Sequence, residues 1–309
     1  MPPTRILLIA NPEAGRHRGE RRLAEAQAQL GALGQVVTPA LTESPGHGSR
    51  LAKANAPDFE IVAALGGDGT VNEVANGLMA VEPGERPALA VLPVGTGNDV
   101  ALTFGLAKFG TALAALANGN TRTLDIVRVQ LVRDGEPITR HALLFAAAGF
   151  AAEVIRKTGP CVKRFFGRRF SYSVGLFRAL AGYRAPEFSV QWDGGKRSGR
   201  MFQVCAGNTE FAAGGVMRVS PGARPDDGLL NISLVDALGR LQIVRRFPSI
   251  LSGSYVEDER VDYFTGKRLE IDAKPTAELQ ADGDIIGTTP ATIELLPGAL
   301  RLVVPPQNS

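Results

Sequence analysis

A glycine-rich turn between a buried strand and a helix is the strongest constraint on the fold of this chain. Gly66-Gly67-Asp68-Gly69-Thr70 follows the apolar run Ile61–Leu65 and leads into Thr70–Ala80, where apolar residues recur at helical spacing. Thr70 and Glu73 have the spacing of a capping box. Glycines in such a turn leave backbone N–H groups exposed at the positive end of the helix dipole, so the segment predicts a phosphate cradle.

A second glycine loop, Pro93-Val94-Gly95-Thr96-Gly97-Asn98-Asp99, follows the next predicted strand, Ala88–Leu92. In an open α/β sheet the carboxyl ends of neighbouring strands border one crevice, where ligands bind. One glycine loop alone favours an ordinary turn, but two in this arrangement favour a ligand site. A dinucleotide fingerprint is excluded because Asn72 takes its third glycine position, and Gly195-Lys196 and Gly266-Lys267 lack the Ser or Thr of a Walker A loop.

The two halves of the chain differ in their pattern. Strand-like and helix-like segments alternate over the first ~120 residues, as in a parallel sheet covered by helices. Short strands and hairpin turns such as Asp193-Gly194 and Asp282-Gly283 follow, with helical stretches around Phe170–Gly182 and Gly239–Ser252. The sequence therefore predicts an α/β protein, with an N-terminal three-layer α/β nucleotide-binding domain (1–125) and a C-terminal β-sandwich domain (126–295).

Composition limits the class of protein further. The 309 residues suit two domains, and a net charge of +3 means that any basic surface must be local. Cys161 and Cys205 are too few for a disulfide framework. The longest apolar run, Ala142–Ala152, is about half of the ~20 residues that a spanning helix needs, and the N-terminus lacks a signal-peptide pattern. We expect a cytoplasmic protein.

The motifs, in their order along the chain, resemble the diacylglycerol kinase catalytic family, which includes sphingosine and ceramide kinases and bacterial lipid kinases. The matching segments are Asn11-Pro12-x-x-Gly15, Gly66–Glu73, Pro93–Asp99, Asp226–Leu229 and Asp282–Asp284. The Gly-Gly-Asp-Gly-Thr element also occurs in NAD kinases and phosphofructokinases, whereas its pairing with Gly-Thr-Gly-Asn-Asp is more specific to lipid kinases. The resemblance implies an ATP- and magnesium-dependent lipid kinase, peripherally associated with a membrane, that phosphorylates a hydroxyl of diacylglycerol or a related lipid in the interdomain cleft. It also implies that residues 296–309 return to the first domain.

The resemblance assigns most of the glycine-loop residues to ATP. The implied ATP contacts are Asn11, Pro12, Gly15, Thr42, Gly66, Gly67, Asp68, Gly69, Thr70, Asn72, Glu73, Gly95, Thr96 and Asn98. Thr42 has an ordinary loop or capping role as its alternative.

The resemblance also implies two magnesium sites. Asp68, Asp99 and Asp125 form the first set of oxygen ligands. Asp227, with backbone oxygens near Arg224 and Leu229, forms a second, structural site. An ordinary Asp-Asp-Gly turn explains the same residues around Asp227 without a metal.

The implied proton acceptor lies in Asp282-Gly283-Asp284, where the family usually has Asp-Gly-Glu. Either carboxylate can accept a hydroxyl proton, so the choice between Asp282 and Asp284 is open. From the residues alone, the segment predicts only a hairpin turn.

A basic, aromatic stretch from Val154 to Pro186 is the predicted membrane contact, because charges near anionic headgroups and rings at the interface favour binding. Its central residues are Lys163, Arg164, Phe165, Phe166, Arg168 and Arg169. Packing of the aromatic residues on the sandwich is the alternative. Nucleic acid is not an expected partner because no binding motif is present, and a homodimer is a further expectation.

Two other functions remain open. A kinase of a soluble acceptor, as in NAD kinases, would share the first glycine loop. A non-catalytic lipid- or nucleotide-binding regulator would keep the fold without turnover, an alternative raised by aspartate at position 284.

Overall fold

The chain forms two compact units, which are described separately. The computed structural model describes residues 3–95, 97–157 and 178–306. The first unit contains residues 1–126, 213–215 and 297–309, and the second contains residues 127–212 and 216–296. The chain therefore leaves the first unit and returns to it twice.

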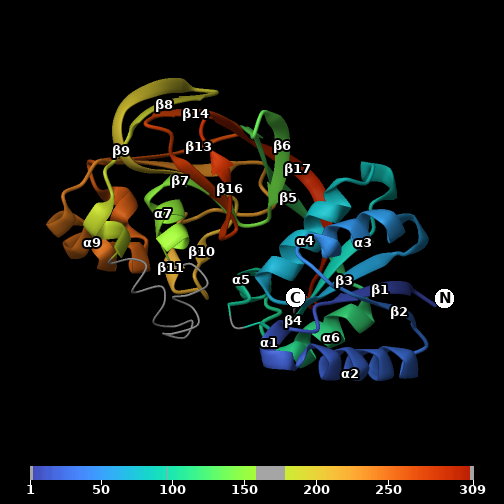
Figure 1. Ribbon diagram of the computed structural model, residues 1–309. Helices are drawn as coiled ribbons and strands as arrows, with labels where there is room; N and C mark the ends of the chain where they lie inside the picture. Colours follow the sequence, from blue (N-terminus) through green and yellow to red (C-terminus); the bar gives the residue numbers. More distant parts are fainter. Residues whose placement is uncertain (1–2, 96, 158–177, 307–309) are drawn as a thin grey trace. The chain divides into compact units, whose positions relative to one another are not determined.

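The first unit is built on a parallel sheet (Figure 1). Its strand order is β2 (Val36–Leu41), β1 (Arg5–Ala10), β3 (Ile61–Gly66), β4 (Ala88–Pro93) and the end of β17 (Ala291–Val303). Every residue of β3 and β4 is buried, as expected for central strands of a parallel sheet covered on both faces.

Helices cover both faces of this sheet and make three layers (Figure 1). They are α1 (Ala14–His17), α2 (Gly19–Ala32), α3 (His47–Asn55), α4 (Asp68–Met79), α5 (Asp99–Thr103) and α6 (Phe109–Asn118). On one face α3 packs on α4, where Gly77 lies so close to the backbone of Ser49 that a larger side chain would collide. On the other face the Arg22 guanidinium of α2 lies 4.4 Å from the centre of the Phe109 ring of α6. The predicted three-layer α/β architecture is confirmed.

The last strand completes the first unit. Leu302 of β17 pairs in parallel with Leu89 of β4. The guanidinium of Arg86 donates hydrogen bonds to the carbonyls of Leu78 (3.0 Å) and Val81 (2.8 Å) and to that of Ala299. One arginine therefore joins the end of α4 to the returning segment.

The second unit is a β-sandwich whose two sheets share one strand. The first sheet runs β6 (Glu136–Ala142), β5 (Thr121–Arg133), β17, β14 (Arg268–Lys274), β8 (Glu187–Trp192) and the first half of β9 (Gly195–Gly207). The second runs β13 (Val261–Gly266), β12 (Leu230–Asp236), the second half of β9, β7 (Phe145–Gly149), β15 (Glu278–Ala281) and β16 (Asp284–Thr288). The core fills the space between them and includes Phe188, Ile232, Leu269 and Ile293. The predicted sandwich is confirmed.

The second unit also contains two helices of eight or more residues in its described part. They are α7 (Phe150–Lys157) and α9 (Arg240–Ser252). The second matches the helix predicted around Gly239–Ser252. Most of the other predicted helical stretch, Phe170–Gly182, lies outside the described residues, and residues 178–182 are helical.

Candidate active site

The first glycine turn joins β3 directly to α4. Gly67 is the N-cap of α4, and Val71 donates the first helical hydrogen bond to the Gly67 carbonyl at 3.1 Å. A side chain on Gly66 would collide with Oγ1 of Thr70, which folds back over the turn. The predicted capping box is wrong because the helix begins at Asp68, ahead of Thr70, and no side chain caps it.

The second glycine loop lies against the first. The backbone N–H groups of Val94 and Gly95 both donate to the Gly66 carbonyl, at 2.9 and 3.3 Å. A Cβ on Gly95 would lie 2.7 Å from Cα of Gly67, so only glycine allows this approach of the two backbones. The structure thus brings together the two loops that the sequence placed at one edge of the sheet.

Asp68 connects the two loops. Its Oδ2 accepts a hydrogen bond from the backbone N–H of Asn98 at 2.8 Å. Its Oδ1 is buried and has no hydrogen-bond partner in the described part of the chain. Asn98 is in the left-handed conformation (φ 57°), and its Nδ2 donates to the Gly95 carbonyl at 2.8 Å. A buried carboxylate oxygen without a donor is costly unless a cation or a ligand satisfies it.

Asp99 begins α5, and its carboxylate accepts a hydrogen bond from the backbone N–H of Gly214. Burial raises the pKa of Asp99, and the nearby charge of Asp68 adds to this effect, while backbone N–H groups of Ala213–Gly215 oppose it. Ala213, Gly214 and Gly215 all have positive φ (56°, 75° and 76°). These residues were not predicted as part of the site, although the Gly214-Gly215 pair is a signal for such a turn.

Asp125 has a different contact from the other two predicted magnesium ligands. It is 4% exposed and accepts a hydrogen bond from the backbone N–H of Gly298 at 2.8 Å. No three Asp, Glu, His or Cys side chains converge in a metal-binding arrangement among the described residues. Asp125 contacts the returning C-terminal segment, and its role with Asp68 and Asp99 in a magnesium site stays a prediction.

The remaining predicted ATP contacts differ in their surroundings. Nδ2 of Asn11 is 3.5 Å from Oγ1 of Thr70, and Gly15 lies so close to Val94 that a Cβ would collide with it. The loop from Asn11 to Gly15, which includes Pro12, therefore contacts both glycine turns. Thr42 follows β2 and donates its backbone N–H to Ala10 at 2.9 Å.

Glu73 and Asn72 of α4 have different partners. The Glu73 carboxylate accepts the backbone N–H groups of Gly46 (2.7 Å) and Gly48 (3.0 Å) at the start of α3. The carboxylate thus caps the neighbouring helix. Oδ1 of Asn72 accepts from Nδ2 of Asn76 at 3.3 Å. Thr96 lies outside the described residues.

In the second unit Asp282 and Gly283 form the two-residue turn between β15 and β16, with φ values of 47° and 89°. The predicted hairpin is confirmed. The Asp282 carboxylate accepts three consecutive backbone N–H groups, from Leu143 (2.7 Å), Leu144 (2.9 Å) and Phe145 (3.0 Å). Burial raises the pKa of Asp282 to about 7, and the Asp284 charge adds to this shift.

Asn208 holds the same loop from its other side. Its Nδ2 donates to the Leu143 carbonyl at 2.8 Å, and its backbone N–H donates to the Leu144 carbonyl at 2.8 Å. Asn208 was not predicted as a site residue because this contact joins residues that are distant in sequence. Asp284, by contrast, is exposed at the start of β16. Asp282 therefore holds the loop in position, whereas Asp284 faces solvent.

Asp227 accepts the backbone N–H of Leu229 at 3.0 Å, the contact of an Asx turn. The Arg224 guanidinium lies 3.6 Å from the carboxylate of Asp226. The turn interpretation accounts for these contacts, and the structural magnesium at Asp227 stays a prediction.

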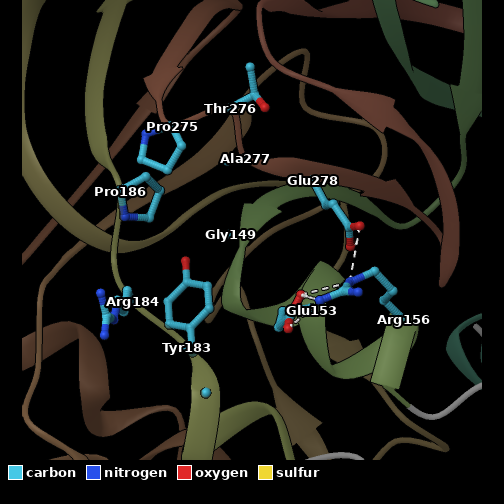
Figure 2. A pocket seen from close by; sticks show the side chains of 11 residues that line it. Gly149, Glu153, Arg156, Tyr183, Arg184, Pro186, Pro275, Thr276, Ala277 and Glu278 are labelled. Carbon is cyan, nitrogen blue, oxygen red and sulfur yellow. Dashed lines mark hydrogen bonds and ion pairs between the residues drawn. The ribbon is translucent and has the colours of Figure 1, made fainter.

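A polar cavity of about 260 Å³ lies beside α7 in the second unit (Figure 2). Arg156 donates to both Glu153 oxygens (2.6 and 2.9 Å) and lies 3.1 Å from Oε1 of Glu278. Burial raises the pKa of Glu278, whose Oε2 has no partner among the described residues.

This cluster bears on the predicted membrane contact. Arg156 and Lys157 both pair with Glu153, so these two members of the basic stretch are engaged within the protein. Lys163, Arg164, Phe165, Phe166, Arg168 and Arg169 lie outside the described residues. No helix within the described ranges has the length and hydropathy needed to cross a bilayer.

Comparison with known proteins agrees with both units. Residues 5–129 match the family model of the diacylglycerol kinase catalytic domain, and residues 144–304 match that of the YegS C-terminal NAD kinase beta sandwich-like domain. A diacylglycerol kinase of Mycobacterium tuberculosis is 30% identical over 97% of this chain and 95% of the relative. A diacylglycerol kinase of Bacillus subtilis is 26% identical over 99% of this chain and 98% of that relative.

A solved structure gives the same result. A Bacillus anthracis protein assigned as a diacylglycerol kinase superposes with a TM-score of 0.80 at 26% identity, covering 99% of this chain and 97% of that one. Together the fold, the paired glycine turns and these matches define a lipid kinase. The chain belongs to the diacylglycerol kinase catalytic family.

Proposed function

We propose that this lipid kinase uses ATP and Mg²⁺ to phosphorylate a hydroxyl of a membrane lipid, with diacylglycerol as the first candidate. The observation that carries the proposal is the contact between the two glycine turns at Gly67 and Gly95, beside Oδ1 of Asp68, which has no hydrogen-bond partner among residues 3–95, 97–157 and 178–306. Backbone N–H groups at the end of β3 and the start of α4 suit the phosphates of a nucleotide. The names of the relatives support diacylglycerol as acceptor.

The carboxylates of the first unit fit a magnesium ion. Asp68 offers a buried oxygen, and its charge contributes to the raised pKa of Asp99, so the two acids are close enough to interact. Two carboxylates suit Mg²⁺, which keeps several water molecules. Asp68 and Asp99 would therefore hold the ion, which would neutralise charge on the transferred phosphoryl group.

In the proposed transfer Asp284 takes the proton of the lipid hydroxyl. The hydroxyl oxygen attacks the γ-phosphorus, the bond from that phosphorus to the β,γ-bridging oxygen breaks, and ADP leaves with that oxygen. Asp284 is preferred as acceptor because its carboxylate is exposed, whereas both Asp282 oxygens already accept backbone N–H groups. Asp282 then positions the turn that carries Asp284. The expected interdomain cleft stays part of this proposal, because the hydroxyl must reach both the nucleotide and Asp284.

The experiment is incubation of the full chain with γ-labelled ATP, Mg²⁺ and separate dispersions of diacylglycerol, monoacylglycerol, ceramide, a sphingoid base and phosphatidylglycerol. NAD is the soluble comparison, chosen because the second unit matches an NAD kinase-like sandwich. Label on one lipid, dependent on Mg²⁺, identifies the acceptor. Label on NAD alone overturns the lipid proposal, and ATP binding without label on any acceptor points to a non-catalytic regulator.

A further inference from the structure

Helix α9 carries a strip of apolar side chains that face solvent. None of its residues is buried, and Leu241, Val244 and Leu251 are 64%, 52% and 41% exposed. At 3.6 residues per turn these three fall within an arc of about 80°, and exposed Pro248 lies in the same arc. Ile243 lies on the opposite face and packs with the buried cluster around Phe202. The helix is therefore attached by one side and leaves its other apolar side uncovered.

A groove continues this strip onto the neighbouring segment. Leu180, Ala181, Arg240, Leu241 and Val244 line a hollow of about 450 Å³. The Arg240 guanidinium donates to the Ala181 carbonyl at 2.5 Å, which joins α9 to the helical residues 178–182. We call Leu180, Ala181, Leu241, Val244, Pro248 and Leu251 the α9 surface.

The charged side chains of α9 itself are all positive. The helix contains Arg240, Arg245 and Arg246 and no acidic residue. Arg246 is paired with Asp258, whereas Arg240 and Arg245 border the apolar strip on its two sides. Exposed Arg178 and Arg184 lie in the adjoining segment. Apolar side chains flanked by arginines are typical of a helix that lies in the plane of a membrane interface.

A second copy of the chain is a less suitable occupant. In a two-fold contact through this surface, the arginines of one α9 helix would lie against the arginines of the other. Neither helix has an acidic residue that could offset this repulsion. An anionic lipid surface supplies both an apolar layer and negative charge. We propose that the α9 surface docks this enzyme on an anionic membrane, with Leu241 and Val244 inserted at the interface. The inference rests on the proposed membrane-lipid substrate.

The test measures binding of the full chain to phosphatidylcholine vesicles with and without phosphatidylglycerol, by co-sedimentation. We expect the double variant Leu241→Asp/Val244→Asp to bind anionic vesicles at least ~10-fold more weakly than the wild type. Arg245→Glu should also bind these vesicles more weakly, and its binding should depend less on salt concentration. Val132→Asp, at a 61% exposed site on β5, and Lys196→Glu, at an exposed hairpin, are the matched controls and should bind as the wild type does.

Activity and stability measurements distinguish the other occupants. The double variant should phosphorylate lipid in vesicles more slowly but short-chain dispersed lipid at the wild-type rate, with an unchanged melting temperature. Unchanged vesicle binding overturns the proposal. If the double variant has half the molecular mass of the wild type in solution, the α9 surface is instead an interface between copies of the chain. If its melting temperature is much lower than that of the wild type, the surface is covered by the chain itself. If no lipid is phosphorylated by the wild type but vesicle binding still depends on α9, the proposed reaction fails and the docking surface stands.

Discussion

The backbone N–H of Asn98 donates to Oδ2 of Asp68 at 2.8 Å, while Oδ1 of the same carboxylate is buried without a partner in the described part of the chain. One oxygen of Asp68 therefore fixes the second glycine loop, and the other is left for a ligand.

Asp68→Asn should keep the loop but lose the charge. The amide oxygen can still accept from Asn98, so the melting temperature should change little. We expect kcat to fall by about 10²–10³, the range for loss of one electrostatic contact to a transferred group. Kinase assays across a magnesium titration check this. Asp134→Asn, at an exposed turn with φ 55°, is the control, and a wild-type rate in Asp68→Asn would contradict the assignment.

Gly95→Ala tests the contact between the two turns. The added Cβ would lie 2.7 Å from Cα of Gly67, and backbone cannot move aside as a flexible side chain can. We expect ATP affinity to fall by at least ~10-fold because the loops must separate. Calorimetric titration measures the affinity. Gly110→Ala on α6, where an added Cβ meets no other described residue within 4 Å, should bind ATP as the wild type does.

Glu73→Ala should change stability and leave nucleotide binding intact. Loss of the contacts to Gly46 and Gly48 removes the cap of α3, which costs about 1–2 kcal/mol. Urea unfolding checks the free energy, and kinetics check that the KM for ATP is unchanged. Glu85→Ala, at an exposed site, is the control. A large rise in KM without loss of stability would instead support the ATP contact implied by the family resemblance.

Asp284→Asn should abolish most turnover without unfolding the protein. Loss of a proton acceptor lowers kcat by about 10²–10⁴, and exposure of this side chain means that little stability depends on it. Asp284→Glu restores a carboxylate on a side chain longer by one methylene and should recover most of the rate. Steady-state kinetics of both variants decide the assignment; equal activity of Asp284→Asn and wild type would exclude Asp284 as the base.

Asp282 makes stability depend on pH. Its pKa in the folded state is about 7, against 3.8 for the ordinary side chain, so between these values the folded protein binds more protons than the unfolded chain. The free energy of unfolding then falls as pH rises across this window. Asp282→Asn cannot titrate, so the wild type should lose stability relative to this variant between about pH 5 and about pH 8. Urea unfolding at both values tests this, and parallel curves would refute it.

Local sequence predicted the elements that carry a strong pattern. The buried strands β3 and β4 and the glycine turns after them were found because apolar runs and glycines are local signals. β7 (Phe145–Gly149) was missed because its alanines lack the β-branched residues typical of strands. β17 runs without a break through Pro297-Gly298, although such a pair locally indicates the end of a strand.

The site was predictable where the backbone conformation required glycine. It was less predictable where a side chain contacts residues that are distant in the sequence. Glu73 looked like part of a nucleotide motif, but its carboxylate caps a helix from another part of the chain. Asp125 accepts a hydrogen bond from Gly298, 173 residues further on, and no local pattern indicated that contact. Neither contact follows from spacing, because tertiary structure chooses the partner.

The return of β17 to β4 has a consequence for synthesis on the ribosome. The sheet that begins with β1 gains its last pairing only at Leu302, so the edge of β4 stays open while all of the second unit is being translated. An open edge can pair with other chains, and contacts between residues so distant in sequence form slowly. The nascent chain therefore carries a first unit with an open β4 edge until the residues of β17 have been synthesised.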